Sequence, residues 1–174
     1  MTRLLTIVAL LLAVTSATLA AQPGQGSSAS KACKAQRNTI GMAAFRQLHA
    51  PAGSPKAAMD ACVGQQVQLV STEAKNAAKA CKAERGTTPA TKEAFAEKYG
   101  TNPNMKNAFG KCVSQKTSEE VAEQQQATLS SAQECKTERG TSASSRTAFA
   151  ERYGTNAGGK NAFGRCVAGK LESA

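Results

Sequence analysis

The chain of 174 residues has no tryptophan, one histidine, five phenylalanines and two tyrosines. A single histidine argues against His-rich metal sites and leaves triad-type catalysis with one candidate base. The close C-x-x-C pairs typical of zinc sites and haem attachment are absent from the sequence. So are the P-loop, Gly-x-Gly-x-x-Gly, His-Glu-x-x-His and EF-hand patterns. We therefore expect no metal and no cofactor, and enzymes are disfavoured without being excluded.

Acidic residues are scarce, with 12 Asp and Glu against 22 Lys and Arg, which gives a formal net charge of +10. Hydrophobic residues make up 41% of the chain, and many of them are alanine. This composition predicts a thin core and a basic surface.

Long apolar runs are limited to the N-terminus. A positive start at residues 1–3 precedes an apolar stretch at 4–14 and a small-x-small ending at 18–20. We interpret residues 1–20 as a cleaved signal peptide, with an uncleaved anchor as the alternative. No second apolar stretch follows, so no transmembrane anchor is expected after cleavage, and the mature protein is predicted to be secreted or extracytoplasmic. Residues 21–32, rich in Gly, Ser and Gln, are predicted to be a flexible lead-in.

The remaining chain is an internal repeat. Residues 81–112 and 135–166 align without a gap, and both contain Ala-Phe-Ala-Glu, Tyr-Gly-Thr-Asn and Asn-Ala-Phe-Gly. A diverged copy occupies residues 33–62 and is two residues shorter. We call these copies unit 1 (33–62), unit 2 (81–112) and unit 3 (135–166).

The six cysteines stand one at each end of each unit. Six cysteines allow 15 pairings, but equivalent positions in a repeat should close in the same way. We predict the disulfides Cys33–Cys62, Cys81–Cys112 and Cys135–Cys166.

The lone histidine, His49, aligns with Tyr99 and Tyr153 four residues after a phenylalanine. We interpret it as a substitute for an amphipathic aromatic residue on a helix face rather than as a catalytic or metal-binding residue.

Helix signals occur within and between the units. In unit 2, Thr88 and Pro89 predict a helix start, and Gly100 predicts its end after Tyr99. The dipeptides Asn102-Pro103 and Ser54-Pro55 predict further helix starts, whereas the Ala-Gly-Gly of residues 157–159 predicts a looser one.

Long helices are expected to join the units. Apolar residues recur at helical spacing from Val63 to Ala77, so 63–80 is predicted to be a connector helix that ends near Gly86. Residues 113–134 form a second, acidic connector that is polar enough either to bridge solvent or to fray. Residues 167–174 are a C-terminal tail. The predicted fold is an all-α tandem array of three disulfide-closed units, each with its own small aromatic core.

The segment Lys106-Asn107-Ala108-Phe109-Gly110-Lys111-Cys112 and its equivalent in unit 3 resemble segments of uncharacterised secreted bacterial proteins. The resemblance covers units 2 and 3, and unit 1 departs from it at Met59-Asp60. It implies secretion and repetition but no particular activity.

Positive charge follows the units, whose net charges are +3, +3 and +4, whereas residues 113–134 carry −3. If the units stack regularly, the repeated cations would form rows suited to polyanions. The alternative is that they serve solubility and helix C-termini. The candidate anion-binding residues are Lys82, Arg85, Lys92, Lys98, Lys106, Lys111, Lys136, Arg139, Arg146, Arg152, Lys160 and Arg165.

The leading hypothesis is a non-enzymatic basic repeat protein that binds an anionic envelope polymer or surface. Sequence-specific nucleic-acid binding is not expected. A protein-binding module that uses the Val63 to Ala77 seam or the polar connector is the main alternative. A membrane-active cationic protein is a weaker alternative, as is a hydrolase using Glu84 and Glu97 or their counterparts Glu138 and Glu151.

Overall fold

The computed structural model describes residues 25–173, which form seven α-helices, one 3₁₀ helix and, within that range, no strand. The helices are α1 (Gln25–Ile40), α2 (Met42–His49), α3 (Pro55–Arg85), α4 (Pro89–Tyr99), α5 (Ala108–Arg139), α6 (Ala143–Tyr153), η1 (Ala157–Gly159) and α7 (Ala162–Glu172). The all-α prediction is confirmed. The predicted signal peptide, 1–20, lies outside the described residues.

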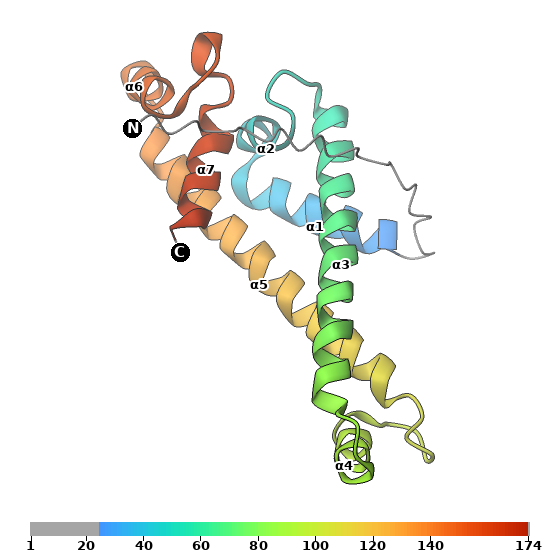
Figure 1. Cartoon of the computed structure of the whole chain (residues 1–174). Coiled ribbons are helices and arrows are strands. Elements are labelled where there is room, and N and C mark those ends of the chain that lie inside the picture. The colour runs from blue at the N-terminus through green and yellow to red at the C-terminus, as the bar shows by residue number, and fades with distance from the viewer. Residues whose placement is uncertain (1–24, 174) are drawn as a thin grey trace, which may run out of the picture.

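The two long helices α3 and α5 run in opposite directions and lie against each other, and they separate the units (Figure 1). Unit 2, with α4, lies at one end of this pair. Units 1 and 3, with α1, α2, α6 and α7, gather at the other end. The three units are therefore joined by long helices, as predicted, but they do not stack in a row, so the expected rows of repeated cations do not form.

All three predicted disulfides are present. Cys33–Cys62 joins α1 to α3, Cys81–Cys112 joins α3 to α5, and Cys135–Cys166 joins α5 to α7. Each bond therefore connects the helix that contains the first cysteine of a unit to the helix that contains its last cysteine.

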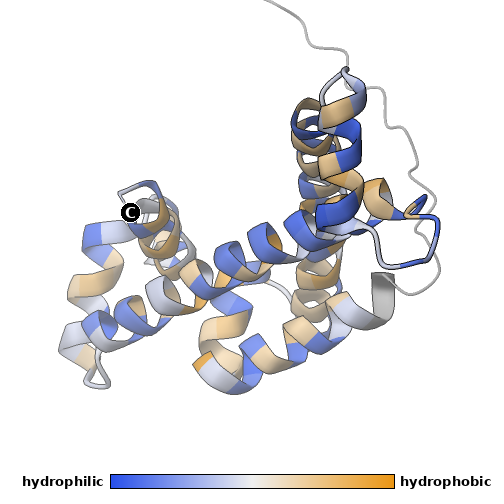
Figure 2. Cartoon of the chain, turned by 90° about the horizontal axis from the view of Figure 1, so that it is seen from below, coloured by the Kyte–Doolittle hydropathy of each residue, from blue (hydrophilic) through white to orange (hydrophobic). Residues whose placement is uncertain are grey.

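Within the described part of the chain, the apolar core consists of two clusters instead of the three predicted. One small cluster belongs to unit 2 alone and contains Cys81, Phe95, Tyr99, Ala108 and Cys112. Units 1 and 3 share the other, which brings Ile40, Ala44 and Phe45 together with Phe149, Phe163 and Val167. Packing two units together buries more apolar surface than either could bury alone, which is why the first and third cores merge. Figure 2 shows hydrophilic residues interspersed with apolar ones along the long helices.

Several predicted helix ends are confirmed. The hydroxyls of Ser54 and Thr88 accept hydrogen bonds from backbone amides three residues on, and a proline follows each of these residues. Gly86 and Gly140 end α3 and α5 with φ of 62° and 64°, a conformation that favours glycine.

The predicted helix start at Asn102-Pro103 is wrong, because α5 begins at Ala108. Asn107 holds the preceding loop in place. Its side-chain oxygen accepts a hydrogen bond from the Thr101 amide at 3.1 Å, and its amide group donates to the Thr101 hydroxyl at 2.7 Å. Asn161 and Thr155 repeat both bonds in unit 3, so α7 begins at the equivalent residue although its loop contains two more glycines than that of unit 2.

The predicted flexible lead-in, 21–32, is helical from Gln25 onward. Helix α1 packs against α3, with Ala29 only 6% exposed and Cys33 fully buried. Tertiary contacts thus override the weak helix propensity of glycine and serine.

The polar connector 113–134 is a continuous part of α5 and lies along α3. The Gln124 amide donates to the buried Glu73 carboxylate at 3.0 Å, and the Gln125 amide donates to the Gln66 side chain at 2.7 Å. Helix α3, which contains the apolar seam, and the polar connector therefore lie against each other within this chain.

We predict that replacing the Cys81–Cys112 bond by alanines will unfold unit 2 locally. Its core is small, and cross-linking cysteines 31 residues apart stabilises by roughly 3–4 kcal/mol in the chain-entropy treatment. In hydrogen exchange, amides of α4 should lose most of their protection while amides of α2 and α7 keep theirs.

The matched variant removes Cys33–Cys62 instead. Because unit 1 also packs against unit 3, protection of α2 should fall less than that of α4 in the first variant. If α2 in this variant lost as much amide protection as α4 does in the first variant, the division into two separate cores would be contradicted.

Candidate anion-binding site

The repeated basic residues fall into two classes, those that form an ion pair with a glutamate of their own unit and those that do not. Lys98 and Arg152 belong to the first class. In unit 2, Lys98 donates to the Glu84 carboxylate at 2.6 Å, Tyr99 donates to the same oxygen at 2.9 Å, and Lys116 lies 3.3 Å from the other oxygen. These interactions, led by the hydrogen bond from Lys98, lower the pKa of the Glu84 carboxyl to about 2.

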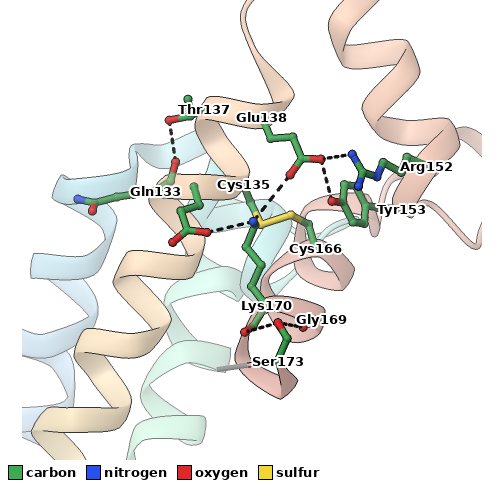
Figure 3. Close-up of a disulfide and its surroundings, with 11 residues drawn as sticks. Gln133, Cys135, Thr137, Glu138, Arg152, Tyr153, Cys166, Gly169, Lys170 and Ser173 are labelled. Atoms are coloured by element: carbon green, nitrogen blue, oxygen red, sulfur yellow. Dashed lines mark hydrogen bonds and ion pairs between the residues drawn. A yellow bond between two sulfur atoms is a disulfide. The ribbon is translucent and has the colours of Figure 1, made fainter.

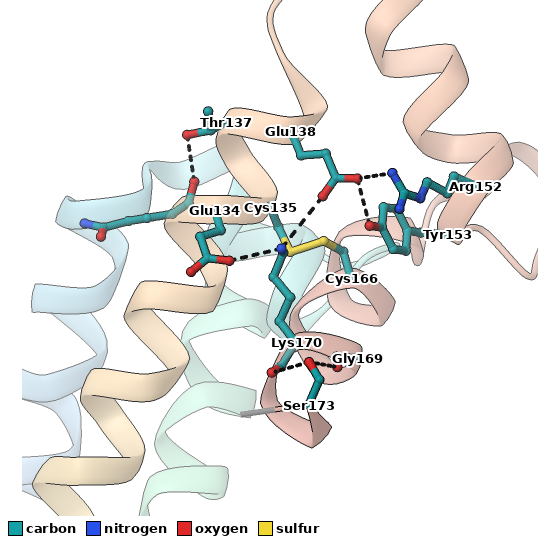
Figure 4. Close-up of polar contacts among 11 residues, drawn as sticks. Glu134, Cys135, Thr137, Glu138, Arg152, Tyr153, Cys166, Gly169, Lys170 and Ser173 are labelled. Carbon is teal, nitrogen blue, oxygen red and sulfur yellow. Dashed lines mark hydrogen bonds and ion pairs between the residues drawn. A yellow bond between two sulfur atoms is a disulfide. The ribbon is translucent and has the colours of Figure 1, made fainter.

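Unit 3 repeats this cluster around Glu138 (Figures 3 and 4). Arg152 and Tyr153 donate to one Glu138 oxygen at 2.7 and 2.8 Å. Lys170 reaches Glu134 at 3.0 Å and Glu138 at 3.9 Å. The hydrogen bond to Glu138 is the main reason that the pKa of Tyr153 is raised. The cluster joins three helices, so Lys98 and Arg152 act as structural ion-pair partners of these carboxylates.

His49 occupies the equivalent place in unit 1. Its ring lies 4.6 Å from that of Phe45, just as Tyr99 packs on Phe95 at 4.9 Å. Its nitrogens lie 2.7 Å from the side-chain oxygens of Gln36 and Gln65, and Gln36 aligns with Glu84. Burial lowers the pKa of His49. The prediction that His49 takes the place of the tyrosine on a helix face is confirmed.

The hydrolase alternative gains no support from these groups. The Glu84 and Glu138 carboxylates are held by cations and by a tyrosine hydroxyl, and Glu97 and Glu151 are exposed on α4 and α6. In residues 25–173, no three His, Cys, Asp or Glu side chains come together as a metal site would require.

Arg85 and Arg139 lie over aromatic rings. Each guanidinium carbon is 5.5 Å from the ring centre of a phenylalanine, Phe109 for Arg85 and Phe163 for Arg139. Arg139 also donates to the Gln47 side chain of unit 1. Burial lowers the pKa of Arg139, and the nearby positive charge of Arg146 adds to the effect.

A shallow basic hollow of about 530 Å³ forms where α3 ends and α4 begins. Its lining residues are Lys79, Lys82, Ala83, Arg85, Gly86, Thr87 and Lys92. Four of these seven residues are cationic, and none of the described residues that line the hollow is acidic. Three of the four cations that line this hollow, Lys82, Arg85 and Lys92, were predicted as anion-binding residues because they recur in the repeat. Lys79 was not predicted, because it stands two residues before Cys81 and so outside the bounds of unit 2. Lys31 has the same place before Cys33, whereas Gln133 has it before Cys135.

Unit 3 has an equivalent hollow of about 490 Å³ with fewer cations. Lys136, Arg139 and Gly140 line it, and Thr39 of α1 forms part of its wall. Arg146 lines a different hollow, with Glu151. Lys106, Lys111, Lys160 and Arg165 are exposed but line neither of these equivalent hollows. The structure therefore brings together only part of the predicted set, and unit 2 has the densest group.

No protein-family model, curated protein or solved structure matches this chain. Within residues 25–173, no helix is both long and apolar enough to pass through a membrane.

The Glu84 cluster predicts a pH dependence. The pKa of Glu84 is about 2 in the folded chain against an ordinary value of 4.5, so the unfolded state takes up the proton first as the pH falls. The stabilisation is therefore complete above about pH 4.5 and is lost progressively toward pH 2. The protection factors of the α4 amides, which are corrected for the pH dependence of intrinsic exchange, should fall across this range.

Glu84→Gln should flatten that dependence, because the amide does not titrate. Glu93→Gln, on the exposed side of α4, should leave it unchanged. An unaltered pH profile in Glu84→Gln would contradict a stabilising role for the ionised carboxylate.

Proposed function

We propose that the protein binds an anionic polymer outside the cytoplasm and that the basic hollow of unit 2 is its principal binding site. The observation that carries this proposal is the convergence of Lys79, Lys82, Arg85 and Lys92 on one hollow without an acidic residue among its lining. The neighbouring Glu84 is paired with Lys98 and Lys116, so its single negative charge is shared by those two lysines and does not face the cations of the hollow.

Helix stabilisation explains only part of this arrangement. Lys82 and Arg85 lie in the last turn of α3, where cations offset the partial negative charge of the helix end. Lys92 lies near the start of α4, where a cation is unfavourable and where the first turn has no acidic residue. A ligand that supplies negative charge accounts for Lys92, and Arg146 has the same place in α6.

The chemistry of such a ligand follows from the shape of the site. The hollow is shallow and its cations are on flexible side chains, which suits a chain of repeated phosphate or sulfate groups better than one enclosed small molecule. Binding would release counterions from the polymer, so affinity should fall steeply with salt. The protein's role would be attachment to an anionic envelope polymer rather than catalysis.

An extracytoplasmic location supports this role. All six cysteines form disulfides, and such bonds persist in oxidising compartments. The apolar start of the sequence, interpreted as a signal peptide, agrees with secretion.

The test compares two triple variants with the same reduction in positive charge. Lys79→Gln/Lys82→Gln/Lys92→Gln removes lysines of the hollow, whereas Lys75→Gln/Lys106→Gln/Lys160→Gln removes exposed lysines that line none of the hollows described above. For a linear polyphosphate, the slope of log affinity against log salt should become shallower by about 0.7–0.9 for each phosphate that is no longer neutralised, and only in the first variant.

Retention on heparin resin gives a second measurement, in which the first variant should elute at clearly lower salt than the second. Equal elution of both variants would show that net charge alone governs binding. Wild-type affinity that does not change with salt would refute the electrostatic mechanism.

A further inference from the structure

We propose that unit 2 has a docking surface for a helix of another protein, formed by Arg85, Phe109, Gly110 and Val113. We call it the unit 2 face. The helix that fits it has the chemistry of α2, because the equivalent residues of unit 3 already bind α2 within this chain. This proposal concerns a second surface and does not depend on polymer binding.

Unit 3 shows how such a face is used. Phe163 and Val167 are 1% and 2% exposed, and they pack in one cluster with Ala44 and Phe45 of α2. Gly164 lies against the end of α2, where a Cβ atom would make ordinary van der Waals contacts with the Gln47 carbonyl oxygen at 3.5 Å and with that of Leu48 at 3.8 Å.

Arg139 completes the interface between unit 3 and α2. It lies over Phe163 and donates to the Gln47 side chain, near the C-terminal end of α2. A cation at this end of a helix is favourable because the last carbonyls carry partial negative charge. Unit 3 therefore recognises a short helix by two features. One is a side with small and apolar residues, and the other is a C-terminal end with unpaired backbone carbonyls and a side-chain oxygen that accepts a hydrogen bond.

Unit 2 has the same internal geometry. Its Arg85 lies 5.5 Å from the Phe109 ring centre, and the Phe95 and Phe109 rings are 6.5 Å apart. The corresponding distances in unit 3 are also 5.5 and 6.5 Å. The surface that binds α2 in unit 3 is thus already formed in unit 2.

Among the described residues, no helix lies upon this surface in unit 2. Arg85 and Gly110 are exposed, and a Cβ atom at Gly110 would meet nothing within 4 Å. Phe109 and Val113 are half-buried, whereas their counterparts in unit 3 are buried. Helix α2 lies at the other end of the α3–α5 pair and cannot reach the face in the same molecule (Figure 1).

The occupant is a helix of a different protein rather than a second copy of this chain. In a second copy, α2 is already covered by its own unit 3, so a symmetrical dimer would require units 1 and 3 to separate. The lysines beside Arg85 favour a partner with Glu, Asp or Gln at the position that Gln47 has in α2. Recognition of a short helix by an apolar face with a polar anchor is a recurrent mode of protein binding.

The test uses a peptide of residues 41–51 as the probe and the full chain as the receptor. An isolated helix of this length does not persist in water, so the probe has a staple in place of Met42 and Arg46, which are exposed in α2. Fluorescence anisotropy should show saturable binding of one peptide per chain. Gly110→Leu should weaken this binding at least about 10-fold, because its side chain would block the helix end.

Gly169→Leu is the matched control, since Gly169 is also helical and exposed with nothing within 4 Å of a Cβ atom. It should leave peptide binding unchanged. Arg85→Gln should also weaken binding by removing the forked donor. Amide exchange of α4 establishes that unit 2 remains folded in each variant.

Three outcomes would overturn the proposal. These are the absence of saturable binding up to millimolar peptide, equal binding by wild type and Gly110→Leu, and a wild-type dimer that Gly110→Leu abolishes without any binding of the peptide. Retention of Gly110→Leu on heparin resin should equal that of wild type, so failure of the docking proposal and failure of polymer binding are distinguishable.

Discussion

The disulfides are the constraint on which the rest of this structure depends. Helix α4 has 11 residues, and the unit 2 core has only five buried residues, two of which are the bonded cysteines. So small a cluster buries too little apolar surface to offset the entropy of ordering a helix and two loops. The Cys81–Cys112 bond holds the end of α3 beside the start of α5, so the aromatic pair of α4 packs on a surface that is already assembled.

A few substitutions in unit 1 explain why the three units are not equivalent. Where units 2 and 3 have a tyrosine paired with a glutamate, unit 1 has His49 near Gln36, which removes the negative charge. Where they have Lys98 and Arg152, unit 1 has Leu48, which packs against the shared core. Unit 1 thereby loses an exposed ion pair and gains apolar surface, and unit 3 covers that surface. Unit 1 packs against unit 3 alone, so no other unit covers the corresponding surface of unit 2.

The sequence was sufficient for the features that repeat. Equivalent cysteines predicted the pairing, the alignment of His49 with Tyr99 predicted its packing, and Pro and Gly signals predicted most ends of the long helices. The start of α5 at Ala108 could not be predicted in this way, because it depends on hydrogen bonds between Asn107 and Thr101 that have no counterpart in helix propensity. The merging of units 1 and 3 comes from tertiary packing, which periodicity along the chain does not contain. The repeat does mark Lys79 by its match with Lys31, but only the fold of unit 2 brings Lys79 near Lys92.

One side chain belongs to both proposed surfaces of unit 2. Arg85 lines the basic hollow and also lies over Phe109 in the unit 2 face. In unit 3, the equivalent Arg139 directs its guanidinium to an acceptor on the docked helix and is half-buried. A helix on unit 2 would draw Arg85 away from a polymer in the same manner, while Lys79, Lys82 and Lys92 would remain available. Each ligand would then lower the affinity of unit 2 for the other only by the contribution that Arg85 makes to binding. Both ligands could therefore occupy unit 2 at the same time.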